Sequence, residues 1–448
     1  MSAHGSMVRH LRVEFSTIYS VALSTASCNL PDMEKEAMDV ELQEVAKTDQ
    51  ELVQSTTVSE SEEKHICRQF DRRVVPIVCV LYVLSYLDRG NIGNAKTAGA
   101  QDDLGLTSVQ WTWVLNAFYI CYVVFEWTTI LWKVFPAHIY VAALCLLWGV
   151  AAMSAGSVHN MAHLIVCRAF LGIFEASFGA GAPYYLSLFH QRHELAFRTS
   201  LLLGMAPFAN CFASALAYGI SQIRNSLEPW RLIFLIEGAP TVLFAPVVFF
   251  FLPDSPNTAK FLKEHEQTQA LERLHTRDLT RKSKIHWKQF LDGATDYRNI
   301  SSTSAATIHS PASQIFPPTI VAGMGYSNIN AQGLTAPVYF TSFLCCVGTA
   351  LLGDRYGKRA FVIMGSALFG CVGYLLLAIL ENEKYNNVRY FAVWLAVCGV
   401  FPALSLNITW LLNNNTSESK RGAGLAILAI FGQCSSFLSS AMVPKVDG

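Results

Sequence analysis

The sequence has little charge, and the charge it has is balanced. Of its 448 residues 15% are charged, with 33 Lys and Arg against 33 Asp and Glu. Soluble domains carry about 25% charged residues, so the composition argues against a soluble globular protein. The balanced charge also gives no sign of a nucleic-acid partner. The hydrophobic content of 52% and the mean hydropathy of +0.32 indicate a membrane protein instead.

The sequence also lacks the usual signatures of metal, redox and catalytic sites. Its 12 cysteines are scattered, and none forms a C-x-x-C pair or a Cys/His ligand pattern. No histidine cluster or nucleophile–base pair falls within the apolar runs. We therefore interpret the cysteines as small hydrophobic residues. We expect no cofactor, no metal ion and no enzymatic activity.

Long apolar runs take the place of these signatures. Each is long enough to cross the roughly 30 Å hydrocarbon core of a bilayer as a helix. The predicted spans are residues 74–95, 111–132, 139–158, 162–189, 199–223, 232–252, 331–352, 361–380, 390–412 and 422–442. The chain is thus predicted to be an all-α polytopic membrane protein, because only helices and closed barrels satisfy their backbone within lipid.

A polar loop divides these spans into two sets. Residues 253–298 are rich in Lys and Arg and are predicted to form a solvated cytosolic connector. The predicted organisation is a disordered cytosolic tail at 1–70, a six-helix half at 71–252, this loop, and an incomplete second half at 299–448. For the first thirty residues two interpretations stay open: a signal or transit peptide, or an extension preceding a natural start at Met33 or Met38.

Basic residues in short loops predict the orientation. Lys and Arg precede the first span, flank the loop after the fourth and fill the central loop, which places all three in the cytosol together with the N-terminus. The basic loop at 353–359 should be cytosolic too, which requires one more crossing before residue 331. The only stretch available, 300–322, is rich in Ser and Thr and broken by three prolines, so we expect a degraded seventh helix. A twelfth crossing is expected to be missing, because the chain stops just after the eleventh.

Charged residues inside the apolar runs are the first candidates for function, since charge near the bilayer centre is costly. Arg168 and Glu175 are seven residues apart, so a helix places them on one face about 10 Å apart. The first span ends with Asp88, Arg89 and Asn91. The structural alternatives are an ion pair that pins two helices together and, for Asp88 and Arg89, solvated charges at the outer mouth.

The second span contributes Tyr119, Tyr122 and Glu126, which follow one another at helical spacing. A buried Glu126 could carry a proton. The interpretation we favour at this stage is a salt bridge from Glu126 to a basic loop at the cytosolic end.

One loop resembles a known family signature. It reads Gly353, Asp354, Arg355, Tyr356, Gly357, Lys358 and Arg359. This pattern is similar to the loop motif of the major facilitator superfamily, in which the acidic residue and the arginines form contacts that lock one access state. The resemblance implies a fold of two six-helix halves, here with helix 7 degraded and helix 12 missing, and a gating role for this loop.

Further blocks resemble one branch of that superfamily. LDRGNIGNA at 87–95, CRAFLGIFEASFGAG at 167–181, PWRLIFLIEGAPTVL at 229–243 and TWLLNNNTSESKRGAG at 409–424 are similar to the anion:cation symporter family, in particular to fungal allantoate, nicotinate and pantothenate permeases. The resemblance implies substrate-binding roles for Arg89, Arg168, Tyr122 and Asn91. It implies proton-coupling roles for Asp88 and Glu175. It departs from this chain after Glu126, where the family has Pro and this sequence has Trp127.

The expected function is proton-coupled uptake of a small organic anion, such as a carboxylate, vitamin or ureide, by alternating access. The expected partners are that anion, protons and the lipid bilayer, for a monomer in the plasma membrane with no nucleic acid. Two alternatives stay open: a proton-coupled exporter of the same fold, and a non-transporting sensor or inactive relative. Segment 300–318 has polar residues where a spanning helix is expected, which favours the non-transporting or inactive alternative.

Overall fold

The computed structural model describes residues 60–223, 227–275, 295–296, 320–321, 323–357, 359–380, 385–415, 420 and 424–434. The chain divides into two compact units, residues 1–63 and residues 64–448. Of the first unit only the beginning of helix α3 (Glu60–Arg73) is described. The described residues contain α-helices and short 3-10 helices and no strand, so the all-α prediction is confirmed.

The helices of the first half begin at recognisable caps. Pro76 opens α4 in the first turn, where its missing N–H is not needed. A capping box between Thr107 and Gln110 begins α6, and the Asn160 side chain caps α8. The elements are α4 (Val75–Thr97), α5 (Ala100–Asp103), α6 (Ser108–Phe125), the 3-10 helix η2 (Glu126–Lys133), α7 (Ala137–Ser154), η3 (Ala155–Ser157), α8 (Met161–Leu186), α9 (Arg192–Ser221), α10 (Pro229–Phe251), η4 (Pro256–Thr258) and α11 (Glu264–His275).

The second half contains three long helices in its described part. They are α14 (Asn328–Tyr356), α15 (Arg359–Ile379) and α16 (Asn386–Asn414), and a short helical piece follows at Gly424–Cys434. Ser327 caps the start of α14. The predicted degraded helix at 300–322 falls almost entirely outside the described residues, and so does most of the predicted span at 422–442.

Eight helices of the described part are long and apolar enough to cross a membrane. They coincide with eight of the predicted spans, from the one that begins at Ser108 to the one that ends at Leu412. The first predicted span corresponds to α4, which has the length but carries Asp88, Arg89 and Lys96. On α15, outward side chains such as Phe361, Met364 and Leu368 are about two-thirds exposed, as expected of a lipid-facing helix.

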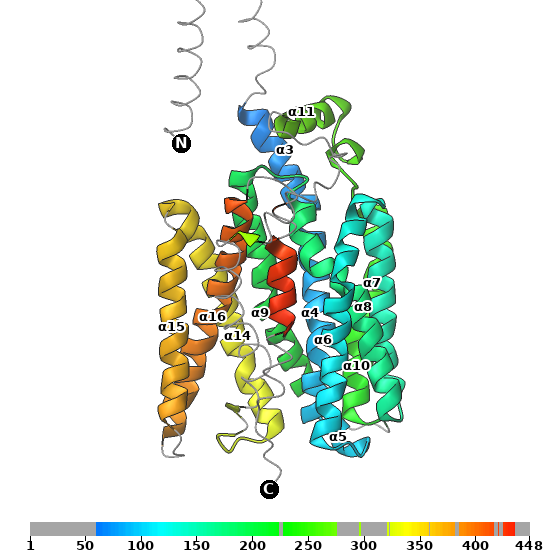
Figure 1. The fold of residues 1–448 in the computed structure, drawn as a ribbon, viewed down its shortest axis with the longest axis vertical. Helices are drawn as coiled ribbons and strands as arrows, with labels where there is room; N and C mark the ends of the chain where they lie inside the picture. The colour runs from blue at the N-terminus through cyan, green and yellow to red at the C-terminus, as the bar shows by residue number, and fades with distance from the viewer. Residues whose placement is uncertain are drawn as a thin grey trace, which may run out of the picture. The chain divides into compact units, whose positions relative to one another are not determined.

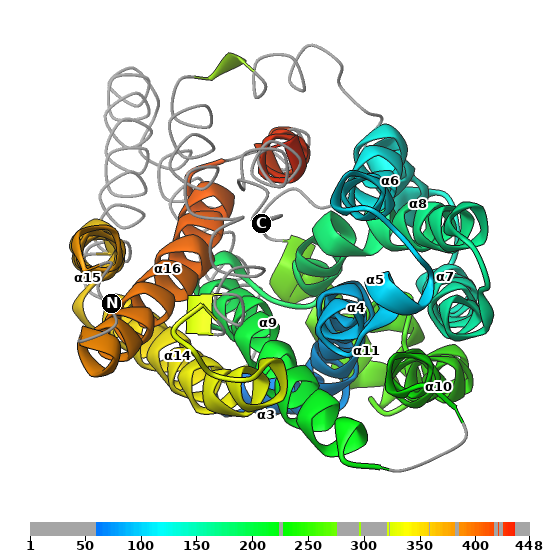
Figure 2. The same ribbon diagram turned by 90° about the horizontal axis from the view of Figure 1, so that it is seen from below.

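The two halves meet along α9 (Figures 1 and 2). Helix α9 packs against α4 within its own half and against α14 and α16 of the second half. Polar contacts join the halves at this seam: Ser200 Oγ lies 2.9 Å from Thr409 Oγ1, and Gln332 donates to Thr97. The remaining helices pack as α6 on α8, α7 on α10 and α15 on α16. Helix α11 and the first residues of α14 lie at opposite ends of the bundle (Figure 1).

Helix α3 is held to the end of the bundle that carries α11 (Figure 1). The Phe70 ring contacts the rings of Phe189 and Phe261. Beside it, Arg198 donates to both carboxylate oxygens of Asp71, at 2.5 and 2.6 Å, and His190 Nε2 lies 3.2 Å away. Burial favours the neutral carboxyl of Asp71, but the hydrogen bonds with His190 and Arg198 outweigh it and lower its pKa to about 2.

Candidate functional site

An ion pair between α4 and α8 forms the centre of the candidate site. Arg89 donates to Glu175 Oε1 from Nη2 at 2.8 Å and from Nε at 3.2 Å. Ser85, one helical turn before Arg89, donates to the same oxygen. The Glu175 side chain is fully buried, and its Oε2 has no partner among the described residues. The structure therefore pairs Arg89, which the family resemblance assigns to anion binding, with Glu175, which it assigns to proton coupling.

Aromatic rings surround the Arg89 guanidinium. Its Cζ lies 4.9 Å from the centre of the Tyr86 ring, 5.3 Å from Phe118 and 5.1 Å from Tyr122. Rings hold a guanidinium by cation–π attraction without neutralising its charge. Arg89 thus keeps one carboxylate partner in a largely apolar surround, so removal of that carboxylate's charge would leave its N–H donors available.

Arg168 lies on α8, two helical turns before Glu175, and is 3% exposed. Its Cζ lies 5.0 Å from the centre of the Phe118 ring, and Nη2 donates to the Arg89 carbonyl at 3.4 Å. Its Nε and Nη1 have no partner among the described residues. A buried cation without a carboxylate is costly, so this is the place where an added anion would gain most.

Asp88 and Asn91 face α10, away from Arg89. Thr241 donates to Asp88 Oδ2 at 2.8 Å. With its amide oriented to satisfy its neighbours, Asn91 donates to the Leu87 carbonyl and to Glu237 Oε2. Glu237 is fully buried. Sequence reasoning did not single out Thr241 or Glu237, although both lie in the block at 229–243, and it missed Ser85, whose spacing of four residues before Arg89 was the available signal.

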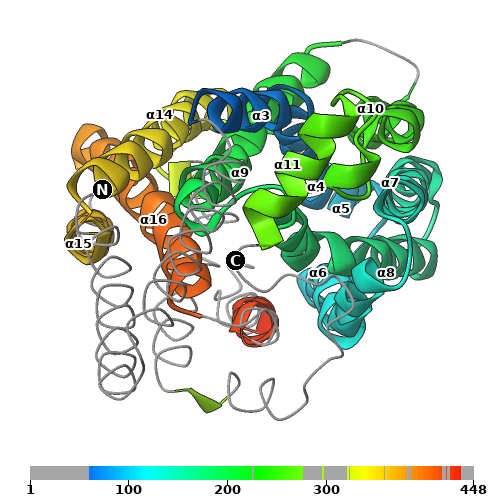
Figure 3. The same ribbon diagram turned by 90° about the horizontal axis from the view of Figure 1, so that it is seen from above.

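A cavity of about 110 Å³ lies between the two halves. Arg89, Tyr122 and Gly179 line it from the first half, whereas Arg168, Asp88, Asn91 and Glu175 do not. Leu404 and Ile408 of α16 and residues 425–433 close it from the second half. Figure 3 shows the short helix at 424–434 between α16 of the second half and α6 of the first half.

A glycine in α8 allows the cavity to form. A Cβ on Gly179 would lie 2.1 Å from the Tyr122 hydroxyl. A Cβ on Gly181 would lie 2.1 Å from Trp132 Nε1, which donates to the Ser177 carbonyl. Both glycines therefore serve close packing between α8 and the α6–η2 segment.

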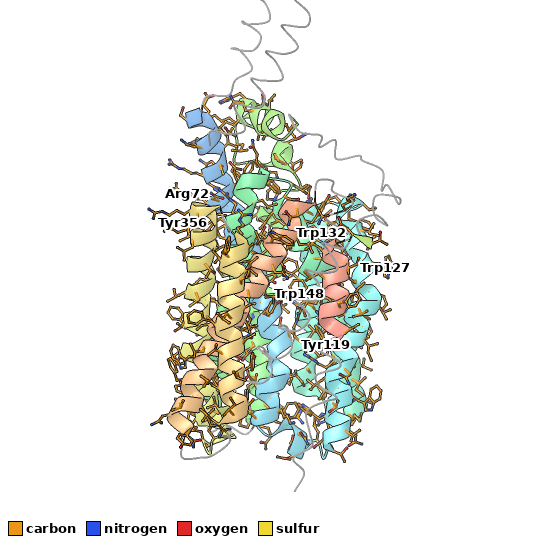
Figure 4. All side chains as sticks on the ribbon, turned by 60° about the vertical axis from the view of Figure 1, so that its left-hand side comes forward. Arg72, Tyr119, Trp127, Trp132, Trp148 and Tyr356 are labelled. Atoms are coloured by element: carbon orange, nitrogen blue, oxygen red, sulfur yellow. The ribbon has the colours of Figure 1, made fainter. Side chains whose placement is uncertain are left out.

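The predicted gating loop forms a closed turn at the end of α14. Gly357 ends the helix with φ of 66°, a left-handed conformation that favours glycine, and its N–H bonds the Gly353 carbonyl at 3.1 Å. Arg359 donates to Asp354 Oδ1 at 2.5 Å across the turn. Lys358 lies outside the described residues. Figure 4 places Tyr356, from this turn, at the same end as Arg72 of α3.

Within the part of the chain that the structure describes, Glu126 forms no salt bridge, in contrast to the interpretation favoured from the sequence. The side chain is 3% exposed, and neither carboxylate oxygen has a partner among the described residues. The reason is local: α6 ends at Phe125, and Glu126 begins the 3-10 helix η2 with its side chain directed inward.

Among the described residues, one group of side chains could share a metal ion: Cys67, Asp71 and His190. Arg198 already donates to both Cys67 Sγ and Asp71. A cation at this position would compete with a guanidinium, so the donor set does not fit a metal site.

Comparison with known proteins establishes the family. The family model of the Major Facilitator Superfamily matches residues 78–440. The chain belongs to the Major Facilitator Superfamily. It is 30% identical over 392 residues to the major facilitator-type transporter hxnP of Emericella nidulans, covering 85% of this chain and 79% of the relative. It is 30% identical over 412 residues to a high-affinity nicotinic acid transporter of Saccharomyces cerevisiae, covering 89% and 77%.

The fold of this superfamily member is also that of solved transporters. The proton:xylose symporter XylE bound to 6-bromo-6-deoxy-D-glucose superposes with a TM-score of 0.63 at 14% identity, covering 83% of this chain and 89% of that chain. The predicted resemblance to fungal transporters of the superfamily and the predicted all-α major facilitator fold are confirmed. The degraded helix 7 and the missing helix 12 stay predictions. The protein is a multi-pass membrane transporter.

Proposed function

We propose that the protein takes up a small organic anion together with protons. The observation that carries this proposal is the arginine pair: Arg168 has no carboxylate partner in the described part, and Arg89 has a single one, Glu175. A planar guanidinium offers a fork of donors matched to a carboxylate. A substrate with a carboxylate would therefore supply the negatively charged partner that Arg168 lacks in the described part of the chain.

Proton coupling follows from the identity of the Arg89 partner. Arginine stays charged at all physiological pH values, whereas a carboxylate can take up a proton. Protonation of Glu175 removes the charge that holds Arg89 at 2.8 Å and frees its donors for the substrate. A proton then favours the same state as the anion, which is the condition for symport.

Similarity supports a carboxylate substrate. One relative is named a high-affinity nicotinic acid transporter, and nicotinate is a monocarboxylate of the size that two arginines and a tyrosine could hold. Nicotinate is therefore the first probe, followed by other vitamins, carboxylates and ureides. A cytosolic N-terminus is part of the proposal, based on the basic residues that gather at one end, and we extend the proposal to a location in the plasma membrane.

The test is uptake of labelled nicotinate and this panel into proteoliposomes. Loss of a hydrogen-bonded charge costs about 1.5–3 kcal/mol, so Arg168→Gln should reduce substrate affinity by about 10–150-fold. Arg231→Gln is the matched control, because Arg231 pairs with Asp103 outside the site. Full uptake by Arg168→Gln would refute the carboxylate role. If labelled nicotinate accumulated only with the proton gradient reversed, so that protons left the vesicles as nicotinate entered, the protein would be an exporter.

A further inference from the structure

Glu126 is a buried acid that the proposed mechanism leaves unused. It is 3% exposed, and both oxygens lack partners in the described part of the chain. Its neighbour Trp127 is 59% exposed, and Figure 4 shows that side chain at the outer edge of the bundle. Glu126 therefore faces the interior at the point where α6 tightens into η2.

The charged and titratable groups around Glu126 are those of the site itself. Tyr122 lies one turn earlier on the same helix face, where residues four apart have Cβ atoms about 5–6 Å apart. The Tyr122 ring lies 5.1 Å from Arg89 Cζ, and Arg89 is the cation that acts electrostatically on Glu126. From α8 the nearest acid is Glu175, which holds Arg89. Lys133, at the far end of η2, lies 5.7 Å from the Tyr184 ring.

A permanent structural role explains this arrangement poorly. A buried carboxylate without a partner is costly, and a buried carboxylic acid without a partner also loses a hydrogen bond. A helix interior that needed only volume would be better served by Leu or Met. The cost is understandable if Glu126 has a partner in another state of the transport cycle. Arg89 is the cation that acts electrostatically on Glu126.

We propose that Glu126 is a second proton-binding carboxylate, which pairs with Arg89 after the anion has left and while Glu175 is still protonated. The exchange is balanced: Glu175 has taken up one proton from water, Glu126 gives up one proton to water, and the ion pair of Arg89 with Glu175 is replaced by one with Glu126. No other bond changes. This inference rests on the proposed anion–proton symport.

The test compares Glu126→Gln with wild type in proteoliposomes, using labelled nicotinate. Exchange of nicotinate across the membrane requires the binding site but no net proton movement, so we expect Glu126→Gln to retain it. Coupling between sites is typically worth 5–150-fold, so accumulation driven by an acid outer pH should fall about tenfold. Protons moved per nicotinate, measured with an entrapped pH dye, should fall as well. Glu228→Gln, an exposed acid at the start of α10, is the control for loss of a charge.

The outcomes separate the two proposals. Wild type that neither exchanges nor accumulates any compound of the panel overturns the proposed function. Wild type that accumulates nicotinate, with Glu126→Gln equal in accumulation and in protons per nicotinate, overturns the role of Glu126 alone. If Glu126→Gln does not fold, Glu126→Asp decides. It keeps a titratable group on a shorter stem and should retain accumulation with a shifted pH profile, whereas an unchanged profile overturns the proposal.

Discussion

At the scale of single residues, the site depends on how closely Tyr122 approaches α8. The Tyr122 hydroxyl occupies the space that a Cβ on Gly179 would need. Tyr122 in turn packs against Arg89, and both residues line the cavity. A methyl group at position 179 would therefore act on the substrate site through the tyrosine.

We expect Gly179→Ala to raise the KM for the anion while leaving the fold intact. Alanine is a better helix former than glycine, so helix α8 should not be weakened by the backbone. Displacement of a binding group by about 1 Å can cost up to about 100-fold in transport efficiency. Gly219→Ala on α9 is the control, since a Cβ there meets nothing within 4 Å. An unchanged KM for Gly179→Ala would contradict the placement of Tyr122 at the site.

The charged residues of the site could be found from the sequence because charge is costly inside an apolar run. Their pairing could not. Arg89 and Glu175 are 86 positions apart, and nothing local indicates that they meet. The facing of Asn91 toward Glu237 was equally hidden, because it depends on the rotation of α4 relative to α10.

At the scale of elements, α3 is fixed to the bundle by the Asp71–Arg198 contact. Asp71→Asn should lower the Tm of the detergent-solubilised protein at pH 7. The Asp71 carboxylate is 37% exposed, so solvent screening limits the loss to about 1 kcal/mol. Asp102→Asn, an exposed acid on α5, is the control.

The pH dependence of this loss has a defined sign. A carboxyl with a lowered pKa stabilises the folded state above its unfolded value of 3.8, and this contribution disappears as the pH falls toward about 2. The Tm difference between Asp71→Asn and wild type should therefore stay constant between about pH 5 and pH 8. A difference that shrank as the pH fell from 8 to 5 would contradict this account.

Helix positions were the part of the structure best predicted from sequence. Long apolar runs predicted the eight spans to within a few residues. The 3-10 helix η2 was not predicted, although the absence of Pro after Glu126 had suggested a different helix end. The reason is that a short change of helix type depends on packing, here of Trp132 against Ser177 on α8.

At the scale of the whole molecule, transport by alternating access requires the two halves to move past each other. Ser200 and Thr409 join them across α9 and α16 at 2.9 Å. With cysteines at both positions, a disulfide of about 2.05 Å should form on oxidation and stop transport. Reduction should restore it. Ser200→Cys and Thr409→Cys alone are the controls, and transport by the fully oxidised double variant would show that this seam does not open.

The central claim is that a proton on Glu175 releases Arg89 for the anion. The most direct test is the Kd of nicotinate, or of the compound of the panel that binds best, as a function of pH in wild type and in Glu175→Gln. Wild type should bind more tightly as the pH falls, because protonation frees Arg89 from its 2.8 Å ion pair. Glu175→Gln imitates the protonated acid and should bind tightly at every pH. Weaker binding by Glu175→Gln, with the pH dependence of wild type preserved, would contradict the account.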